Sequence, residues 1–494
     1  MVPEIKKETA FAGQARHAPH GSQGHHTGAS RLSAPVFDAL RFQAASFDVI
    51  AASHAPPSLL AQRQTSRLER LLQAAQQGSA FYRERLPATP VAADFARVQP
   101  VMRDELMQRF ADWVTDPALQ LDELRGFTAG LARVGEGFKG YMAWESSGTS
   151  GRPGVFVQDA ATLAVYDALE AVRHRVRAPH GLFNPYTAAG LGERTALVTA
   201  TQGHFASIVS FERLRRINRW FGQTSASFDI QQPLGDLCRQ LQAFGPTIVA
   251  TYPTAATLLA ERQQAGALAI HPHHVVTGGE SLGGGARALI GSALGTTVRA
   301  SYGASEFLPI AWECGHGQLH VNSDWVILEP VDEKLRPVPP GELSHSVLLT
   351  NLANLVQPVI RYDLGDQVTL QPGRCACGSA LPVIEVLGRR DDILRVPAAG
   401  ARGGDVALLP LALSTVIEEQ GGVFDFQLQQ RGPRSLVLRI ANAGVEGHAA
   451  MARCKQALAA YLEAQGAAPV RVHGEIGCHL PRGRSGKACR MMFG

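Results

Sequence analysis

The sequence predicts an α/β protein with a large N-terminal domain and a smaller α+β domain at its C-terminal end. The chain has 494 residues, which is more than one hydrophobic core usually organises. In the middle of the chain, apolar strands alternate with helical segments, which is typical of βαβ units and of mostly parallel sheets. From about residue 318 the strands follow one another closely, which adds an antiparallel subdomain to the larger domain.

The chain is expected to begin with a disordered tail and to become ordered near residue 36. Residues 1–35 are rich in Gly, Ser, Ala and His and show no hydrophobic periodicity. Four histidines of this tail could instead bind a metal, namely His17, His20, His25 and His26. A helix is predicted over 58–77, because its leucines recur on one helical face and Gly78 follows.

The predicted elements after residue 190 fall into four groups. Parallel strands are expected over 194–201, 246–252, 274–278 and 297–302. Helices are expected between them, over 255–264 and 285–294. Antiparallel strands are expected over 320–329, 343–350, 359–362 and 368–370. The smaller domain, which begins near Gly388, is expected to contain strands near 424–429 and 435–440 and a helix near 449–465.

Composition and charge exclude several classes of partner. The formal net charge is +4 and no stripe of Lys and Arg stands out, so we expect no nucleic-acid partner. No apolar stretch approaches the ~20 residues that cross a bilayer, and the N-terminus lacks the apolar core of a secretory signal. Seven cysteines, an odd number, fit a reducing compartment better than a disulfide framework. We therefore expect a cytoplasmic protein with no membrane partner.

A segment rich in glycine and hydroxyl side chains, 146–154, is the most informative part of the chain. Glycine lets the backbone approach an anion closely, and hydroxyls with exposed backbone N–H groups form a concave anion site. The segment lacks the GxxxxGK[ST] pattern of a Walker A loop. A solvated linker is the alternative explanation of such a run. The residues predicted to hold phosphates are Ser146, Ser147, Gly148, Thr149, Ser150 and Gly151.

Two further segments follow predicted parallel strands, at the edge where such sheets bind ligands. The first, 277–282, contains Gly279 and Glu280, and its glycines let a flat ligand approach the backbone. A plain turn before a helix explains this segment equally well. The second, 302–306, combines an aromatic ring that can stack on a purine with a carboxylate that can hold Mg²⁺, and an exposed turn is its alternative. Its candidate residues are Tyr302, Gly303, Ser305 and Glu306.

Three polar segments lie further along the chain. In 361–366, Asp366 follows a glycine and could accept from two ribose hydroxyls, although a Gly-Asp pair is usually a turn. The segment 388–392 lies between the two predicted domains and is either a surface patch of ion pairs or a hinge. Near the end, Lys487 lies on a basic, glycine-rich loop. Most such lysines are solvated, but this one could carry its charge into a phosphate or carboxylate site.

Taken in order, these segments resemble those of the adenylate-forming (AMP-binding) superfamily, which includes acyl-CoA synthetases and nonribosomal adenylation domains. The closest resemblance is to the phenylacetate–CoA ligase-like branch, and it runs from about Leu71 to Lys487. The motifs that carry it are SSGTSGRPG, TGGESL, YGASE, RYDLGD, GRRDD and PRGRSGK. It implies an N-terminal adenylation domain over 36–387 and a small mobile domain over 388–494. It also implies ATP-dependent activation of a carboxylic acid as an acyl-adenylate, release of pyrophosphate, and transfer to a thiol.

The resemblance implies a role for each candidate residue. The loop at 146–151 would hold the β- and γ-phosphates, Asp366 the ribose and Glu306 the Mg²⁺, while Lys487 would bridge the acid and the α-phosphate. Further nucleotide contacts would come from Gly279, Glu280, Tyr302, Gly303, Ser305 and Arg389, with the hinge at Asp391 or Asp392. The implied cofactors are ATP and Mg²⁺. The implied partners are a small carboxylic acid, aromatic or otherwise, and a thiol acceptor that is CoA or a carrier protein. The protein could also form a homodimer.

Cysteine and histidine residues form a candidate zinc site. A closed tetrahedral site needs four thiolate or imidazole ligands, and such a site is structural because no coordination position stays open. Some phenylacetate–CoA ligase-like proteins resemble this pattern and carry a structural metal there. Three free, partly buried cysteines are the alternative. The expected ligands are Cys314, His320, Cys375 and Cys377, with His316 as a substitute.

The chain departs from the family pattern at two places. Asp363 stands where most relatives have Arg, and 394–406 looks longer and less regular than the strand on which the thiol arm of CoA rests. Adenylation is therefore better supported than transfer to CoA. An amine or hydroxyl acceptor, or a nucleotide-binding protein that has lost catalysis, are the alternatives. His204 and Phe205 follow a strand and could line the acid pocket, although core packing explains Phe205 equally well.

Overall fold

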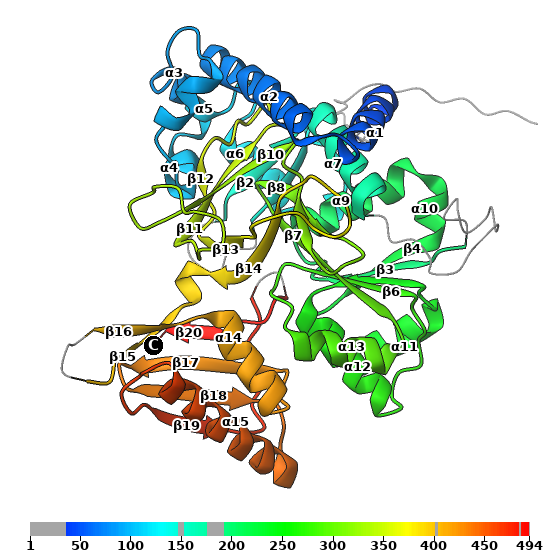
Figure 1. Ribbon diagram of the computed structural model, residues 1–494. Coiled ribbons are helices and arrows are strands. Elements are labelled where there is room, and N and C mark those ends of the chain that lie inside the picture. The colour runs from blue at the N-terminus through cyan, green and yellow to red at the C-terminus, as the bar shows by residue number, and fades with distance from the viewer. Residues whose placement is uncertain (1–35, 147–152, 175–191, 401–403, 484–485, 494) are drawn as a thin grey trace, which may run out of the picture. The chain divides into compact units, whose positions relative to one another are not determined.

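The structure is a computed structural model that describes residues 36–146, 153–174, 192–400, 404–483 and 486–493 (Figure 1). The tail predicted over 1–35 and residues 147–152 of the predicted phosphate loop lie outside the described residues. A large mixed sheet and a separate small C-terminal sheet confirm the predicted α/β fold class. In the described part of the chain, no helix has the length and apolar character needed to cross a membrane.

A sheet of nine strands forms the centre of the larger part of the molecule (Figure 1). Its parallel strands are β3 (Thr195–Thr199), β4 (Ser225–Asp229), β5 (Ile248–Thr251), β6 (His274–Gly278) and β7 (Thr297–Ala304). Its antiparallel strands are β8 (Phe307–Glu313), β9 (Leu319–Val321), β13 (Asp366–Leu370) and β14 (Val383–Arg389). The order is β13-β14-β9-β8-β7-β6-β5-β3-β4, so part of the predicted antiparallel segment extends the parallel sheet.

Two smaller sheets belong to the same part of the chain. A hairpin of β1 (Met142–Glu145) and β2 (Val155–Gln158) flanks the predicted phosphate loop. An antiparallel sheet contains β10 (Val326–Val331), β11 (Ser346–Asn351) and β12 (Tyr362–Asp363).

Two predicted antiparallel strands are shorter than expected. The single strand predicted over 320–329 is wrong, because a turn separates β9 from β10. In that turn the backbone N–H of Trp325 donates to the Asn322 carbonyl at 2.8 Å. The strand predicted over 359–362 is reduced to β12, because Arg361 has a φ of 51° and cannot continue an extended chain.

Helices precede the large sheet and cover its parallel strands. The helices before the sheet are α1 (Ala39–Ser53), α2 (Pro57–Gly78), α3 (Ala80–Arg83), α4 (Arg103–Gln108), α5 (Phe110–Trp113), α6 (Leu121–Thr128) and α7 (Ala160–Leu169). Those along the strands are α9 (Ala206–Ile217), α10 (Arg219–Thr224), α11 (Leu234–Phe244), α12 (Pro253–Gln264) and α13 (Gly284–Leu294). The short 3₁₀ or π turns are η1 (Ala92–Arg97), η2 (Leu131–Arg133), η3 (Glu170–His174), η4 (Arg390–Asp392) and η5 (Val416–Gln420). The buried leucines of α2 confirm the predicted helical face.

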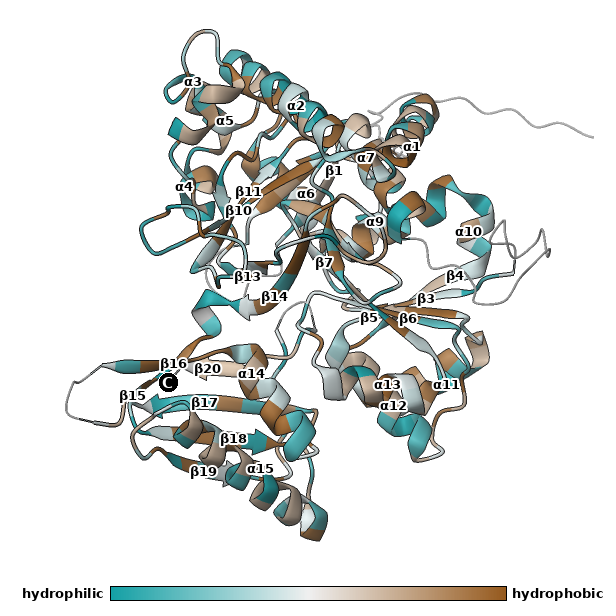
Figure 2. Ribbon diagram, in the orientation of Figure 1, coloured by the Kyte–Doolittle hydropathy of each residue, from teal (hydrophilic) through white to brown (hydrophobic). Residues whose placement is uncertain are grey.

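The C-terminal part of the chain has its own sheet and its own apolar core. Its elements are the hairpin of β15 (Leu394–Pro397) and β16 (Asp405–Leu408), helices α14 (Pro410–Thr415) and α15 (Gly444–Ala464), and strands β17 (Phe426–Gly432), β18 (Ser435–Ile440), β19 (Arg471–Glu475) and β20 (Met491–Phe493). All residues of its core cluster lie between Leu394 and Met491. Hydrophobic residues, brown in Figure 2, lie on both its helices and its strands. We call 36–389 the large lobe and 394–493 the small lobe.

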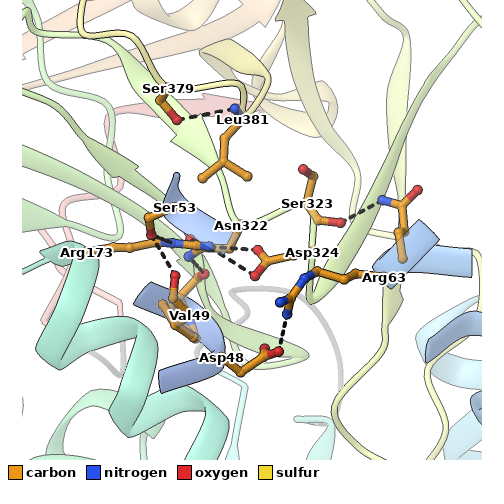
Figure 3. A network of polar contacts seen from close by, with 12 residues as sticks. Asp48, Val49, Ser53, Arg63, Arg173, Asn322, Ser323, Asp324, Ser379 and Leu381 are labelled. Carbon is orange, nitrogen blue, oxygen red and sulfur yellow. Dashed lines mark hydrogen bonds and ion pairs between the residues drawn. The ribbon is translucent and has the colours of Figure 1, made fainter. Parts of the chain in front are cut away.

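A buried polar network ties the first helices to the turn between β9 and β10 (Figure 3). Arg173 of η3 donates to Asp324 Oδ1 at 2.7 Å, to Asp324 Oδ2 at 3.0 Å and to Asn322 Oδ1 at 2.8 Å. Its Nε also donates to Ser53 Oγ of α1 at 3.1 Å. Both ionic side chains are almost fully buried, with exposed fractions of 1% for Arg173 and 0% for Asp324. Arg173 is therefore the nearer of the two cations that compensate the Asp324 charge, since Arg67 Nη1 lies 3.8 Å from Asp324 Oδ2.

We expect Arg173→Met to destabilise the large lobe by about 3–5 kcal/mol, because the buried Asp324 carboxylate loses both hydrogen bonds from Arg173 and keeps only Arg67, whose Nη1 lies 3.8 Å from Oδ2. The measurement is the shift of the urea midpoint of its unfolding transition. Arg336→Met removes a surface ion pair to Asp332 and serves as the control, with an expected loss of at most about 1 kcal/mol. Equal losses in the two variants would contradict the assigned role of Arg173.

Candidate active site

Two tyrosine–carboxylate pairs join the end of β7 to the segment that contains β12. The Tyr302 hydroxyl donates to Asp366 Oδ2 at 2.7 Å, and the Tyr362 hydroxyl bonds to the Glu306 carboxylate. In each segment the acid follows the tyrosine by four residues. The tyrosine of each segment bonds to the acid of the other. Burial raises the pKa of both Asp366 and Glu306, and the hydroxyl donors partly oppose that rise.

The tight turn between β7 and β8 positions these side chains. A Cβ atom at Gly303 would overlap the Leu308 carbonyl oxygen, so glycine is needed where the two strands meet. Trp144 Nε1 of β1 donates to the Ser305 carbonyl at 2.8 Å. The same turn is thereby attached to the strand that leads into the predicted phosphate loop. The nucleotide contacts expected of Gly303 and Ser305 stay predictions.

Cations from later parts of the chain reach the same place. Arg389 Nη1 lies 3.5 Å from Asp366 Oδ1. Gly279 has a φ of 77°, and a Cβ atom there would lie 2.8 Å from Lys487 Cε. Burial lowers the pKa of Lys487, while the charges of Glu280 and Asp366 oppose that shift. Four segments that are far apart in sequence thus contribute to one polar site.

Glu280 is bound on both sides by hydrogen-bond donors. Its Oε2 accepts from the Thr254 backbone N–H at 3.1 Å and from Thr254 Oγ1 at 2.8 Å, at the start of α12. Its Oε1 accepts from the Ala488 backbone N–H at 2.8 Å. The carboxylate therefore connects the large lobe to the residue that follows Lys487.

Ser146 closes the base of the predicted phosphate loop. Its Oγ accepts from the Gly154 N–H at 2.9 Å, and its own N–H donates to the Gly154 carbonyl at 2.8 Å. These bonds hold the two ends of the loop together, next to the β1–β2 hairpin. The other predicted loop residues, Ser147, Gly148, Thr149, Ser150 and Gly151, lie outside the described residues.

Comparison with known proteins gives a result for structure only, since no protein-family model and no curated protein matches the chain. A 2-hydroxyisobutyryl-CoA ligase in the postadenylation state, in complex with R3-HIB-AMP, matches with a TM-score of 0.65 and 17% identity, over 90% of this chain and 91% of that chain. The same ligase in the thioesterification state, with 2-HIB-AMP and CoA, matches with a TM-score of 0.54 and 18% identity over the same shares. The chain therefore shares the fold of this 2-hydroxyisobutyryl-CoA ligase.

The connection between the lobes is held by an ion pair. Asp363 Oδ2 lies 3.1 Å from Arg390 Nη1, and the Asp363 side chain is only 6% exposed. Asp363 Oδ1 also accepts from the Gly365 N–H at 2.9 Å. Asp363, which departs from the family pattern, is therefore paired with an arginine of η4. Asp391 and Asp392 lie in the same turn, and their role as hinge residues stays a prediction.

Tyr362 and Arg390 were not predicted as site residues, although they lie inside the RYDLGD and GRRDD motifs. The signal for Tyr362 is the repeated spacing of a tyrosine and an acid in YGASE and YDLGD. The signal for Arg390 is the pair of adjacent arginines in GRRDD, combined with Asp363 at a position where most relatives have Arg.

The two residues predicted to line an acid pocket, His204 and Phe205, are buried. His204 is 1% exposed, and its ring centroid lies 5.4 Å from that of Phe127. Burial lowers the pKa of His204, which keeps its imidazole neutral. Phe205 is 4% exposed and packs in a cluster with Ile208 and Phe211. Both side chains are part of the core, and contact with an acid stays a prediction.

Four predicted metal ligands come together at one end of the large sheet. The ligand atoms of Cys314, His320, Cys375 and Cys377 all lie within 4.8 Å of one another. Cys314 Sγ is 3.7 Å from Cys375 Sγ, and Cys377 Sγ is 3.3 Å from His320 Nε2. His320 Nδ1 is 3.0 Å from the Leu381 carbonyl, which orients Nε2 toward the thiols. Tetrahedral zinc with Zn–S bonds of about 2.3 Å has sulfur–sulfur edges of about 3.8 Å, so the geometry fits this metal.

We expect Lys487 to titrate below the ordinary lysine value of about 10.4, because burial disfavours its charged form. Competitive acetylation as a function of pH, followed by mass spectrometry, measures this titration residue by residue. Lys334, which is exposed, is the internal reference, and Asp366→Asn should lower the Lys487 value further by removing an opposing charge. A Lys487 titration at or above that of Lys334 would show that the lysine is solvated.

Proposed function

We propose that this protein activates a small organic acid with ATP, forms an acyl-adenylate and releases pyrophosphate, and passes the acyl group to the thiol of CoA. The observation that carries the proposal is the convergence of Lys487 with Gly279 and Asp366 in an adenylate-forming fold. The 2-hydroxyisobutyryl-CoA ligase with this fold has been solved with an acyl-AMP and with CoA. The sequence motifs further support the phenylacetate–CoA ligase-like branch.

The residues of the site suit the parts of this reaction. Asp366 would accept from the ribose hydroxyls, with Arg389 beside it. Ser146 and the loop that it closes would hold the β- and γ-phosphates through backbone N–H groups and hydroxyls. Lys487 would meet the negative charge that develops between the acid and the α-phosphate, the kind of interaction that contributes roughly 3–4 kcal/mol.

Glu306 is suited to hold Mg²⁺. Its carboxylate is 7% exposed, and burial raises its pKa, so a cation at this place would relieve the cost of an ionised carboxylate. Mg²⁺ prefers such hard oxygen ligands and, when bound, shields the charge of the phosphates.

A second candidate differs only in the acceptor. The segment after the hinge, which departs from the family pattern, forms the β15–β16 hairpin, and its residues 401–403 lie outside the described residues. Because the described part of this segment pairs as a regular antiparallel hairpin rather than irregularly, the case for an amine, a hydroxyl or a carrier protein as acceptor rests on its sequence alone. The alternative of a protein that has lost catalysis rested partly on the unusual Asp363. It is less well supported, because Asp363 forms an ion pair with Arg390.

We expect acid-dependent exchange of pyrophosphate into ATP when the purified protein is given a panel of aromatic and short aliphatic acids. Lys487→Ala should lower this exchange by about 100- to 1,000-fold while circular dichroism stays unchanged. Lys334→Ala, at an exposed position, should leave it unchanged. Exchange that survives in Lys487→Ala would exclude the proposed role. Loss of free CoA thiol in step with AMP release distinguishes CoA from an amine or hydroxyl acceptor.

We also propose a structural zinc ion at Cys314, His320, Cys375 and Cys377. Four protein ligands leave no open position for chemistry. The ion would join β9 to the 375–377 turn, close to the buried network that includes Arg173.

Protein purified without chelator is expected to carry about one zinc per chain, and Cys375→Ser should reduce that content because three ligands hold zinc less tightly. Cys478→Ser changes a free cysteine of the small lobe and is the matched control. Metal analysis that finds no zinc in the unaltered protein would remove the proposal.

A further inference from the structure

Three consecutive glycines begin α13 and face two carboxylates of the small lobe. Glu419 Oε1 accepts from the Gly285 N–H at 3.1 Å. A Cβ atom at Gly285 would lie 2.9 Å from Glu419 Cγ, and one at Gly283 would lie 2.7 Å from Glu418 Oε2. Since both distances are shorter than ordinary carbon contacts, the missing side chains are what allow the small lobe to approach this helix.

The charges at this contact are complementary. The first turn of a helix presents unpaired N–H groups and carries a partial positive charge. Glu418 is 2% exposed, and Arg490 Nη1 donates to its Oε1 at 2.5 Å. Its Oε2 has no hydrogen-bond partner among the described residues and lies at the start of α13. A buried carboxylate oxygen of this kind is unfavourable unless a positive potential lies opposite.

A second bridge lies five residues earlier in the same segment. Glu280 accepts from the Ala488 N–H, directly after Lys487. The segment 279–285 therefore contacts the small lobe at Lys487, at Ala488 and at Glu419.

We propose that Glu280 and Glu419 are positioning residues that hold the small lobe in the arrangement that delivers Lys487 to the site. The proposal rests on the proposed function, in which Lys487 acts only when the small lobe is in place. A charge–dipole contact of this kind shifts an equilibrium by about 2- to 30-fold. That is enough to favour one arrangement while leaving the small lobe free to move on for transfer of the acyl group.

The test is hydrogen–deuterium exchange at the Ala488 amide of the full chain, without ATP or acid. Gly285→Ala and Glu419→Gln should raise that exchange about 2- to 10-fold, because the first adds a Cβ against Glu419 and the second removes its charge. Gly291→Ala is the matched control in the same helix, since a Cβ there meets only Thr296 O at 3.5 Å and Val298 Cγ2 at 4.0 Å. Alanine is the better helix former at both positions.

Exchange within α13 separates positioning from plain destabilisation. The proposal expects the amides of α13 to stay protected in Gly285→Ala while Ala488 becomes exposed. Ala488 exchange that is unchanged in Gly285→Ala and Glu419→Gln, or that is already unprotected in the unaltered chain, would overturn the proposal. Because the measurement needs no turnover, it is independent of the pyrophosphate-exchange result for Lys487→Ala.

Discussion

The reciprocal bonding of Tyr302 with Asp366 and of Tyr362 with Glu306 is the constraint on which the candidate site depends. Tyr302 of β7 and Asp366 of β13 lie in the same nine-stranded sheet, whereas Tyr362 belongs to β12 of the three-stranded sheet. Each hydroxyl supplies one donor to a buried carboxylate. Removing either hydroxyl would take that donor from a buried acid, so both pairs hold the acids in place, and the Tyr362–Glu306 pair also links the two sheets.

The charges of the site are divided along the chain. The acids Glu280, Glu306 and Asp366 belong to the large lobe, whereas Arg389 and Lys487 come from the end of that lobe and from the small lobe. ATP would add further negative charge to the acidic part. Bound nucleotide would therefore strengthen the attraction of Arg389 and Lys487 to the site. This would couple the position of the small lobe to the ligand.

Local patterns predicted the regular elements better than the contacts between them. The strands 274–278 and 435–440 have the predicted bounds because apolar runs there end at turn residues. The break at Asn322 was not predictable, since it depends on buried bonds to distant parts of the chain. The four zinc-ligand candidates come together as expected. The bond from Ala488 to Glu280 has no sequence signature, because its donor is a backbone N–H that every residue except proline carries.

The ion pair between Asp363 and Arg390 acquires a mechanical meaning beside the two bridges at α13 and Glu280. A rigid body pinned at two points can still pivot about the line that joins them, whereas a third point off that line removes the last rotation. Glu280–Ala488 and Gly285–Glu419 attach the small lobe itself, and Asp363–Arg390 fixes the connection that leads into it. Release of the Asp363–Arg390 pair would therefore ease rotation of the small lobe about the line through the two bridges.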